Sequence, residues 1–319
     1  MTPIGVPRPR SEPVGAVPRP PAARVFGGGP ALIGHRGLGC GVVRGHPENT
    51  LGSFTAAAAL GMTWVEADVR RTADDVLVVA HDEAYPDGTR VADIGAAEAD
   101  RRGTLRLHTL LERLPPEVGL DVDLKSAIDD SLRSPARTTA ALLALVVAAE
   151  ARRRQLLVTS FDPAALGTLR AQAPSLPLGW LTWHRFPLDA AVAACAHMDV
   201  DVLGLHVGSL ADRGTGTVDP ITVADTLPFV HGAGRRLMVW CPDVHLAGAL
   251  LEAGADAVVV DGVPAALESL RARGARVRSA VGGGLGGDGA PSGVPGGAPP
   301  GGGPAGTPPT GAPPAPPST

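Results

Sequence analysis

Aromatic side chains, excess basic charge and long apolar runs are all scarce in this sequence, and each scarcity excludes a class of protein. Phe, Trp and Tyr make up 3% of the 319 residues and the formal net charge is −4, so no basic stripe with aromatics is available to bind a nucleic acid. No stretch is long and apolar enough to cross a bilayer, and the N-terminus lacks the apolar run of a signal peptide. We therefore expect no nucleic-acid partner and no transmembrane segment.

Cysteine is equally sparse. Cys40, Cys195 and Cys241 are odd in number and lie far apart along the chain. These spacings match neither a disulfide framework nor a local zinc motif. We expect free thiols in a reducing compartment and predict a cytoplasmic location.

Large apolar side chains are rare at both ends of the chain. Residues 1–29 are rich in proline and arginine, and from residue 281 onward nearly every residue is Gly, Pro, Ala, Ser or Thr. Such segments bury too little apolar surface to offset the entropy of ordering them. The composition predicts disordered tails over 1–29 and 275–319 and one folded domain over 30–274. A domain of that length is typical of a (β/α)₈ barrel.

Short apolar runs alternate with Ala- and Leu-rich helical patterns between the two tails. Several runs are continuously apolar, as expected of parallel strands that are buried on both faces. Helices are expected between most of them, for example over 51–60, which Gly61 follows, and over 138–149. The predicted strands span 31–34, 64–69, 76–80, 119–124, 156–159, 178–181, 202–205, 237–240 and 257–260.

This pattern contains one strand more than an eight-stranded barrel can hold. Only residues 70–75 separate the second strand from the third, which is too few for a helical crossover. We therefore interpret residues 76–80 as the returning arm of a hairpin over the barrel mouth. The alternative is an open doubly wound sheet, but its glycine-rich phosphate loop is missing after the first strand.

Acidic side chains occupy alternating positions on two of the predicted strands. Glu66 and Asp68 share one face of the second strand, because side chains alternate along a strand. The same alternation puts Asp121, Asp123 and Lys125 on the inner face of the strand at 119–124. Neighbouring carboxylates repel unless a cation joins them, and an all-oxygen set suits Mg²⁺ or Ca²⁺. The alternatives are a solvated edge strand for the first pair and a structural Asp–Lys pair for the second.

Two histidines follow strand ends. His35 and Arg36 come directly after the first strand, where strand ends lead to the active-site face of a barrel. The hairpin would bring His81 back to the mouth opposite His35, so the two imidazoles could act as general acid and base around a phosphorus centre. Taken singly, His35 could instead be a capping or core residue and His81 a surface residue. Glu48 lies where it could orient Arg36.

In their order along the chain, these motifs resemble the glycerophosphodiester phosphodiesterase family, whose members are phosphatidylinositol-phospholipase-C-like TIM barrels. The resemblance covers residues 31–270, with weaker landmarks at 160–162, 239–240 and 261–264. The stronger motifs are His35-Arg36, Pro47-Glu48-Asn49-Thr50, Glu66-Ala67-Asp68-Val69, Val78-Val79-Ala80-His81-Asp82 and Asp123-Leu124-Lys125. Asn49 or Thr50 also suits the N-cap of the first helix.

The resemblance implies a barrel that binds one divalent cation and cleaves glycerophosphodiesters to sn-glycerol 3-phosphate and an alcohol. Glu66, Asp68 and Asp123 would hold the cation, which we expect to be Mg²⁺ or Ca²⁺, with Mn²⁺ as a further candidate. In the route proposed for the family, the glycerol 2-hydroxyl attacks phosphorus and water then opens the cyclic phosphate.

The resemblance also implies roles for the remaining polar side chains. His35 and His81 would act as acid and base, Arg36 and Lys125 would hold the phosphate, and Trp240 would contact the substrate. Two alternatives remain: lysophospholipase D activity on monoacyl glycerophospholipids, and a catalytically silent barrel that binds phosphodiesters or a protein partner. A nucleic-acid phosphodiesterase is disfavoured by the acidic charge balance.

Three features depart from the family pattern. Asp123 stands where the family usually has the longer Glu. The stretch over 38–46 is longer than usual, which would reshape the mouth. Cys241, Pro242 and Asp243 follow Trp240, where the family often has Thr and Asn, so the contacts to the glycerol or headgroup are expected to differ.

Overall fold

The computed structural model describes residues 25–27, 29–211, 218 and 220–272, so the predicted tail at 275–319 lies outside the described residues. The described part of the other tail includes Val25 and Phe26, both of which are buried. Phe26 packs edge-on against Trp64, with 5.5 Å between the ring centroids. Two apolar side chains before the predicted domain boundary at residue 30 therefore pack into the barrel.

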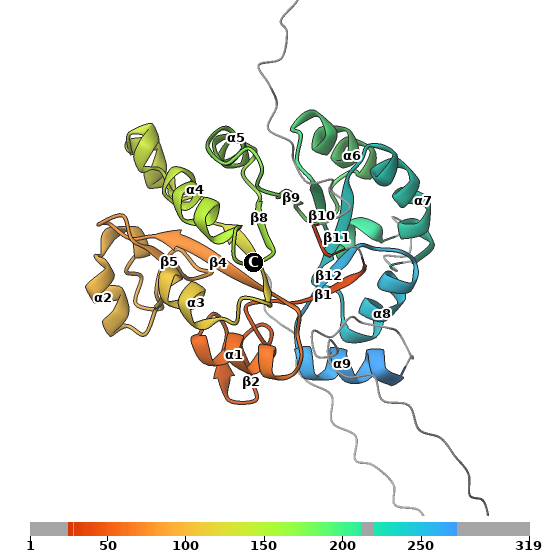
Figure 1. Cartoon of the computed structure of the whole chain (residues 1–319), viewed down its shortest axis with the longest axis horizontal. Coiled ribbons are helices and arrows are strands. Elements are labelled where there is room, and N and C mark those ends of the chain that lie inside the picture. The colour runs from red at the N-terminus through yellow and green to blue at the C-terminus, as the bar shows by residue number, and fades with distance from the viewer. Residues whose placement is uncertain (1–24, 28, 212–217, 219, 273–319) are drawn as a thin grey trace, which may run out of the picture. The chain divides into compact units, whose positions relative to one another are not determined.

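The described residues contain a closed barrel of parallel strands (Figure 1). Each barrel strand pairs with the next, and β1 closes the ring by pairing with both β12 and β4. The barrel strands are β1 (Ala31–Gly34), β4 (Trp64–Arg71), β7 (Gly119–Leu124), β8 (Leu156–Ser160), β9 (Leu178–Thr182), β10 (Val202–His206), β11 (Arg236–Trp240) and β12 (Ala257–Val260). The predicted (β/α)₈ fold is confirmed.

Two short antiparallel ribbons add to the barrel. β5 (Leu77–Val79) pairs with β4 as the predicted hairpin arm, and β6 (Leu105–Arg106) pairs with β5. β2 (Val42–Val43) and β3 (His46–Pro47) form a small hairpin inside the long loop after β1, which the sequence did not predict. Both ribbons follow barrel strands, so they lie at the end of the barrel where strands lead into the connecting loops.

Helices form the outer layer of the barrel (Figure 1). The α-helices are α1 (Leu51–Ala59), α2 (Ala96–Arg101), α3 (Leu107–Arg113), α4 (Thr139–Glu150), α5 (Pro163–Gln172), α6 (Leu188–His197), α7 (Pro220–Gly232), α8 (Val244–Glu252) and α9 (Val263–Ala272). The short 3₁₀ helices are η2 (Val91–Asp93), η3 (Ile128–Leu132), η4 (Pro135–Arg137) and η5 (Val207–Leu210). In the described part of the chain, none of these helices could span a bilayer. The cytoplasmic location stays a prediction.

The alternation of side chains along β4 separates two apolar layers. Val65 and Ala67 point outward into the large core that packs against the helices. Trp64 points inward and packs in the smaller core inside the barrel. Gly119 faces this indole across the β4–β7 pair, and a Cβ there would lie 2.5 Å from the ring. The base of the barrel is therefore filled with apolar side chains, and the polar inner positions lie above it.

Candidate functional site

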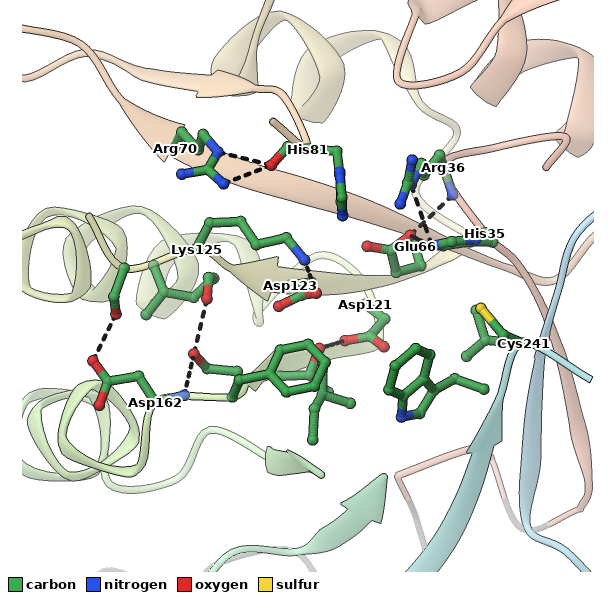
Figure 2. A pocket seen from close by; sticks show the side chains of 18 of the residues that line it. His35, Arg36, Glu66, Arg70, His81, Asp121, Asp123, Lys125, Asp162 and Cys241 are labelled. Atoms are coloured by element: carbon green, nitrogen blue, oxygen red, sulfur yellow. Dashed lines mark hydrogen bonds and ion pairs between the residues drawn. The ribbon is translucent and has the colours of Figure 1, made fainter. Parts of the chain in front are cut away.

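Carboxylates from β4 and β7 come together above the apolar base of the barrel (Figure 2). The parallel register places Glu66 beside Asp121 and Asp68 beside Asp123. Glu66, Asp68 and Asp123 are buried, and one oxygen from each lies within 4.8 Å of the other two. We call these three residues the acidic set. The predicted inward alternation thus brings together side chains that are far apart in sequence.

The acidic set has more buried negative charge than the surrounding protein neutralises. Glu66 Oε1 and Asp123 Oδ1 are buried and have no hydrogen-bond partner. Burial, together with the charges of Asp68 and Asp123, raises the pKa of Glu66 well above its usual range. Burial likewise raises the pKa of Asp123. Buried oxygens without partners are costly, so this all-oxygen arrangement can hold a hard divalent cation.

Asp121 lies next to the acidic set without being part of it. Its Oδ1 accepts a 2.9 Å hydrogen bond from the Thr159 hydroxyl on β8. Burial raises the pKa of Asp121 well above its usual range, although this hydrogen bond opposes the shift. Because burial outweighs this hydrogen bond, the Asp121 carboxyl group favours its protonated form.

Lys125 extends from the end of β7 over the acidic set. Its Nζ lies 2.9 Å from Asp68 Oδ1 and also contacts Asp123 Oδ2. Burial lowers the pKa of Lys125, but the two carboxylates outweigh it and raise the pKa overall. Burial disfavours ionised Asp68, yet Lys125 and Arg36 lower its pKa below the usual value. Part of the acidic charge is therefore balanced by the Asp–Lys pairing that the sequence left as an alternative.

Arg36 contacts two members of the acidic set, Glu66 and Asp68. Its backbone N–H donates to Glu66 Oε2 at 2.9 Å, which a positive φ of 48° makes possible. The guanidinium Nε lies 3.2 Å from Asp68 Oδ2, and Nη1 donates to Glu48 Oε1 at 2.5 Å. Glu48 therefore lies where it fixes the orientation of the Arg36 fork.

Of the two residues predicted to cap the first helix, Asn49 and Thr50, only Thr50 takes that position. The Thr50 hydroxyl caps α1 by accepting from the Ser53 N–H at 3.2 Å. Asn49 instead turns back, with φ 57°, and its Nδ2 donates to Asp68 Oδ2 at 2.8 Å. Asn49 is thus part of the polar site. From the sequence alone, this role could not be distinguished from helix capping.

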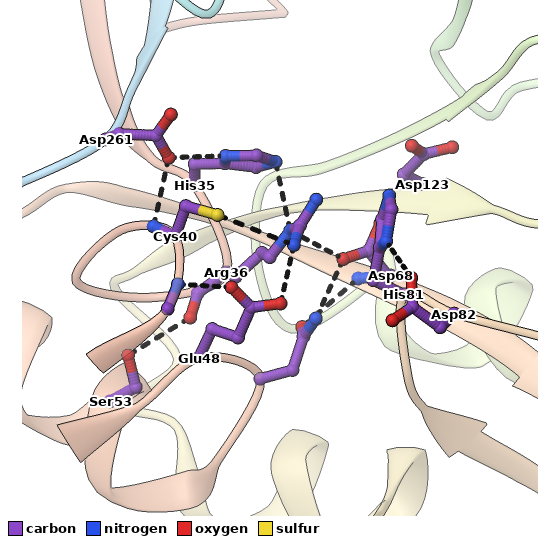
Figure 3. A network of polar contacts seen from close by, with 12 residues as sticks. His35, Arg36, Cys40, Glu48, Ser53, Asp68, His81, Asp82, Asp123 and Asp261 are labelled. Atoms are coloured by element: carbon purple, nitrogen blue, oxygen red, sulfur yellow. Dashed lines mark hydrogen bonds and ion pairs between the residues drawn. The ribbon is translucent and has the colours of Figure 1, made fainter. Parts of the chain in front are cut away.

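His35 is held at both ring nitrogens (Figure 3). Nδ1 lies 2.7 Å from Asp261 Oδ1, and Nε2 lies 3.2 Å from Arg36 Nε, which donates to it. A carboxylate only accepts and a guanidinium only donates, so this network assigns the proton to Nδ1 and leaves Nε2 as an acceptor. Burial opposes ionised Asp261, but the hydrogen bond from His35 helps to lower its pKa below the usual value. No role for Asp261 was predicted from the sequence, although it directly follows β12 and strand ends lead to the active-site face of a barrel.

His81 reaches the same cavity from the hairpin arm. Its Nδ1 lies 2.8 Å from Asp82 Oδ1, and its backbone carbonyl accepts from Arg70 Nε and Nη2 at 2.8 and 2.6 Å. Arg70 therefore anchors the loop that carries the imidazole. In Figure 2 the rings of His35 and His81 both point toward the space above Glu66 and Asp123.

The cavity above the acidic set has a volume of about 720 Å³ and one aromatic wall. Phe161 stacks on Trp183 with 4.3 Å between ring centroids and meets Trp240 edge-on at 5.5 Å. These three residues form what we call the aromatic wall. Trp180 and Phe186 pack edge-on against each other and do not line the cavity.

The residues of the third departure from the family pattern, which follow Trp240, have different surroundings. Asp243 caps α8 by accepting from the backbone N–H groups of His245 and Leu246, both at 2.9 Å. It is a structural residue that does not line the cavity. Cys241 does line the cavity, with a positive φ of 56°.

Comparison with known proteins gives a consistent result. Residues 35–264 match the glycerophosphoryl diester phosphodiesterase family. The chain is 30% identical over 269 residues to the probable glycerophosphodiester phosphodiesterase 2 of Mycobacterium tuberculosis, across 77% of this chain and 93% of that protein.

Solved structures resemble the barrel as well. A putative glycerophosphoryl diester phosphodiesterase from Silicibacter pomeroyi superposes with a TM-score of 0.62 at 25% identity, over 77% of this chain and 94% of that one. An Oleispira antarctica phosphodiesterase, solved in complex with the product sn-glycerol-3-phosphate, shares the fold with a TM-score of 0.61 at 23% identity, over 77% and 99% of the two chains. The family resemblance of the sequence is confirmed, and this chain belongs to the glycerophosphoryl diester phosphodiesterase family.

Proposed function

We propose that this protein hydrolyses glycerophosphodiesters to sn-glycerol 3-phosphate and an alcohol, with the help of a divalent cation. One observation carries the proposal: the buried acidic set has oxygens within 4.8 Å of one another, and its members Glu66 and Asp123 line a cavity together with His35 and His81. Membership of the phosphodiesterase family supports the same reaction.

Glu66, Asp68 and Asp123 would hold the cation, because one buried oxygen of each lacks a hydrogen-bond partner, although that of Asp68 is ion-paired with Lys125. Oxygen ligands favour Mg²⁺ or Ca²⁺, and Mn²⁺ is also compatible. When bound, such an ion supplies Lewis-acid chemistry, which lowers the pKa of an attacking hydroxyl and draws off phosphate charge.

The two histidines divide the proton transfers between them. His35 Nε2 is the acceptor nitrogen of its ring, so His35 removes the proton from the attacking glycerol 2-hydroxyl. Asp261 positions the ring through Nδ1 and stabilises the imidazolium that forms. His81 gives a proton to the departing alcohol oxygen, and in the second half of the reaction the two roles reverse as water opens the cyclic phosphate.

Arg36 and Lys125 bind the phosphate in this proposal. The Arg36 fork is held by Glu48 and suits two phosphate oxygens at once, whereas Lys125 contributes a point charge. Trp240, whose ring lies on the aromatic wall, contacts the glycerol or the headgroup. A catalytically silent barrel would not need this complete set of acid, base and phosphate groups around one cavity.

A second candidate substrate is a monoacyl glycerophospholipid, which would make the enzyme a lysophospholipase D. The observation in its favour is Trp183, which lines the cavity yet keeps 65% of its surface exposed. An apolar chain that leaves the cavity would cover this indole.

The test is hydrolysis of glycerophosphocholine and glycerophosphoethanolamine, each with Mg²⁺, Ca²⁺, Mn²⁺ or EDTA. We expect release of glycerol 3-phosphate with at least one cation and none with the chelator. Turnover that resists EDTA would contradict the metal role. Release of lysophosphatidate from a monoacyl substrate, at a higher kcat/KM than glycerol 3-phosphate release, would favour the second candidate.

A further inference from the structure

A second group of metal-ligating side chains lies beside the acidic set. His35, Cys241 and Asp261 directly follow β1, β11 and β12, which are neighbouring strands of the barrel. One ligand atom from each residue lies within 4.8 Å of those of the other two, and all three residues are half-buried. Figure 2 shows Cys241 beside His35, and Figure 3 shows Asp261 at the far side of the same ring.

The donor atoms of this second group differ in chemistry from the acidic set. An imidazole nitrogen, a thiol sulfur and a carboxylate oxygen replace three carboxylates. Sulfur and nitrogen donors favour Zn²⁺ and Co²⁺ over Mg²⁺ or Ca²⁺, and three protein ligands with one open position make a common zinc geometry. We propose that His35, Cys241 and Asp261 form a second metal site that is selective for zinc-like ions and that inhibits the enzyme when it is filled.

The contacts around the three side chains favour a cation. Asp261 Oδ1 accepts from the Cys40 N–H at 3.0 Å as well as facing His35 Nδ1 at 2.7 Å, so the carboxylate is fixed beside the ring. Burial, followed by the Asp261 charge, raises the pKa of Cys241 to about 12, so an ion has to displace the proton of this thiol when it binds. Metal binding forms the sulfur–metal bond and breaks the S–H bond, and the proton passes to solvent.

Inhibition follows from the ring nitrogen that the metal would occupy. Nδ1 of His35 faces Asp261, so the ion replaces the proton on that nitrogen. The neutral ring then carries its proton on Nε2, and the hydrogen bond that Arg36 Nε donates to Nε2 breaks. Nε2 is the acceptor that the proposed function requires. The inhibitory part of the inference therefore rests on the proposed role of His35, whereas binding of the ion does not.

Co²⁺ reports on this site directly, because a cysteine thiolate bound to Co²⁺ gives a charge-transfer absorption in the near ultraviolet. The full chain is saturated with Mg²⁺ to fill the acidic set and then titrated with Co²⁺. We expect the absorption in the wild type, its loss on addition of Zn²⁺, and its absence in Cys241→Ser. Cys195→Ser is the matched control, since that thiol is buried on α6 outside the cavity lining, and it should keep the band.

Two results would overturn the site: no charge-transfer band in the wild type, or a band that persists in folded Cys241→Ser but disappears in Cys40→Ser. Thermal melting of each variant shows that it is folded. In parallel, Zn²⁺ added to the Mg²⁺-loaded enzyme should lower kcat, and Cys241→Ser should need about tenfold more Zn²⁺ for the same loss. A wild-type band without loss of kcat would support the site and overturn the assignment of His35 as the base.

Discussion

The two walls of the candidate active-site cavity differ in chemistry and in how tightly they are held. The polar wall, from β1, β4, β7 and the hairpin arm, carries the acidic set, whose members are braced by Arg36, Asn49 and Lys125. The aromatic wall consists of Phe161, Trp183 and Trp240, which contact one another mainly through their rings. In the proposed function, the polar wall supplies the groups for cleavage at phosphorus, a step common to all phosphodiesters. The aromatic wall supplies a surface for the headgroup or acyl chain, which varies between substrates. Changes in the polar wall should therefore lower kcat, and changes in the aromatic wall should alter substrate preference.

The largest effect is expected for His35→Ala. Loss of a general base lowers kcat by about 10²–10⁴-fold. His108→Ala is the matched control, because His108 is an exposed histidine on α3 outside the cavity lining, and it should leave kcat unchanged. The measurement is the steady-state rate of glycerol 3-phosphate release. Equal activity of the two variants would remove His35 from the mechanism.

The next effect concerns the shortened ligand of the polar wall. Asp123→Glu restores the side-chain length usual in the family and lets the carboxylate reach further toward Glu66 and Asp68. We expect the Mn²⁺ concentration for half-maximal activity to fall about tenfold, equivalent to about 1.4 kcal/mol. Asp189→Glu, the same change at an exposed position on α6, should have no effect. If the wild type reached half-maximal activity at a lower Mn²⁺ concentration than Asp123→Glu, the shorter side chain would not weaken cation binding.

A smaller effect is expected on the aromatic wall. Trp183→Ala removes the exposed indole, and KM for a monoacyl substrate should rise about tenfold while KM for glycerophosphoethanolamine changes little. Phe229→Ala provides the control, since Phe229 is 71% exposed on α7, outside the cavity lining. A uniform change in KM across both substrates would contradict the division of labour between the walls.

The smallest effect is a pH dependence of stability in the metal-free protein. Burial raises the pKa of Glu66, Asp121 and Asp123, so the folded state holds these protons more tightly than the unfolded chain does. The contribution of these carboxyl groups to the free energy of unfolding is fully present below their unfolded pKa of about 4. It is lost as pH rises through their raised pKa values in the folded state. With EDTA, Tm should be lower at pH 8 than at pH 6, by about 2–4 °C for each kcal/mol lost.

Saturating Mg²⁺ should reduce that difference in Tm, because the cation replaces the protons on the polar wall. Asp121→Asn offers a sharper comparison: it removes one raised pKa without removing a member of the acidic set. Its Tm in EDTA should therefore vary less with pH than that of the wild type. A metal-free Tm that rises from pH 6 to pH 8 would contradict the assigned direction of the pKa shifts.

Much of the barrel was predictable because strand periodicity is a local property of the sequence. The eight barrel strands and the hairpin arm lie where the apolar runs predicted them, and β4 merely extends two residues further, to Arg71. Alternation along β4 and β7 was enough to predict that Glu66, Asp68 and Asp123 face one interior. These features need only the order of residues within a strand and the rule that strands of a barrel are parallel.

The features that the sequence missed depend on contacts between distant residues. His35 and Asp261 are separated by 226 positions, so no local pattern could reveal which ring nitrogen is held. Asn49 has the composition of a helix cap, and only the tertiary fold shows that its amide turns to Asp68 instead. Val25 and Phe26 lie in a proline-rich context that predicts disorder, yet they fill apolar space at the base of the barrel.

A crystal structure with Mn²⁺ and sn-glycerol 3-phosphate would show where the cation and the phosphate bind. We expect one anomalous Mn²⁺ peak coordinated by Glu66, Asp68 and Asp123, with the phosphate between the imidazoles of His35 and His81. A cation bound elsewhere, or a phosphate that contacts neither imidazole, would contradict it.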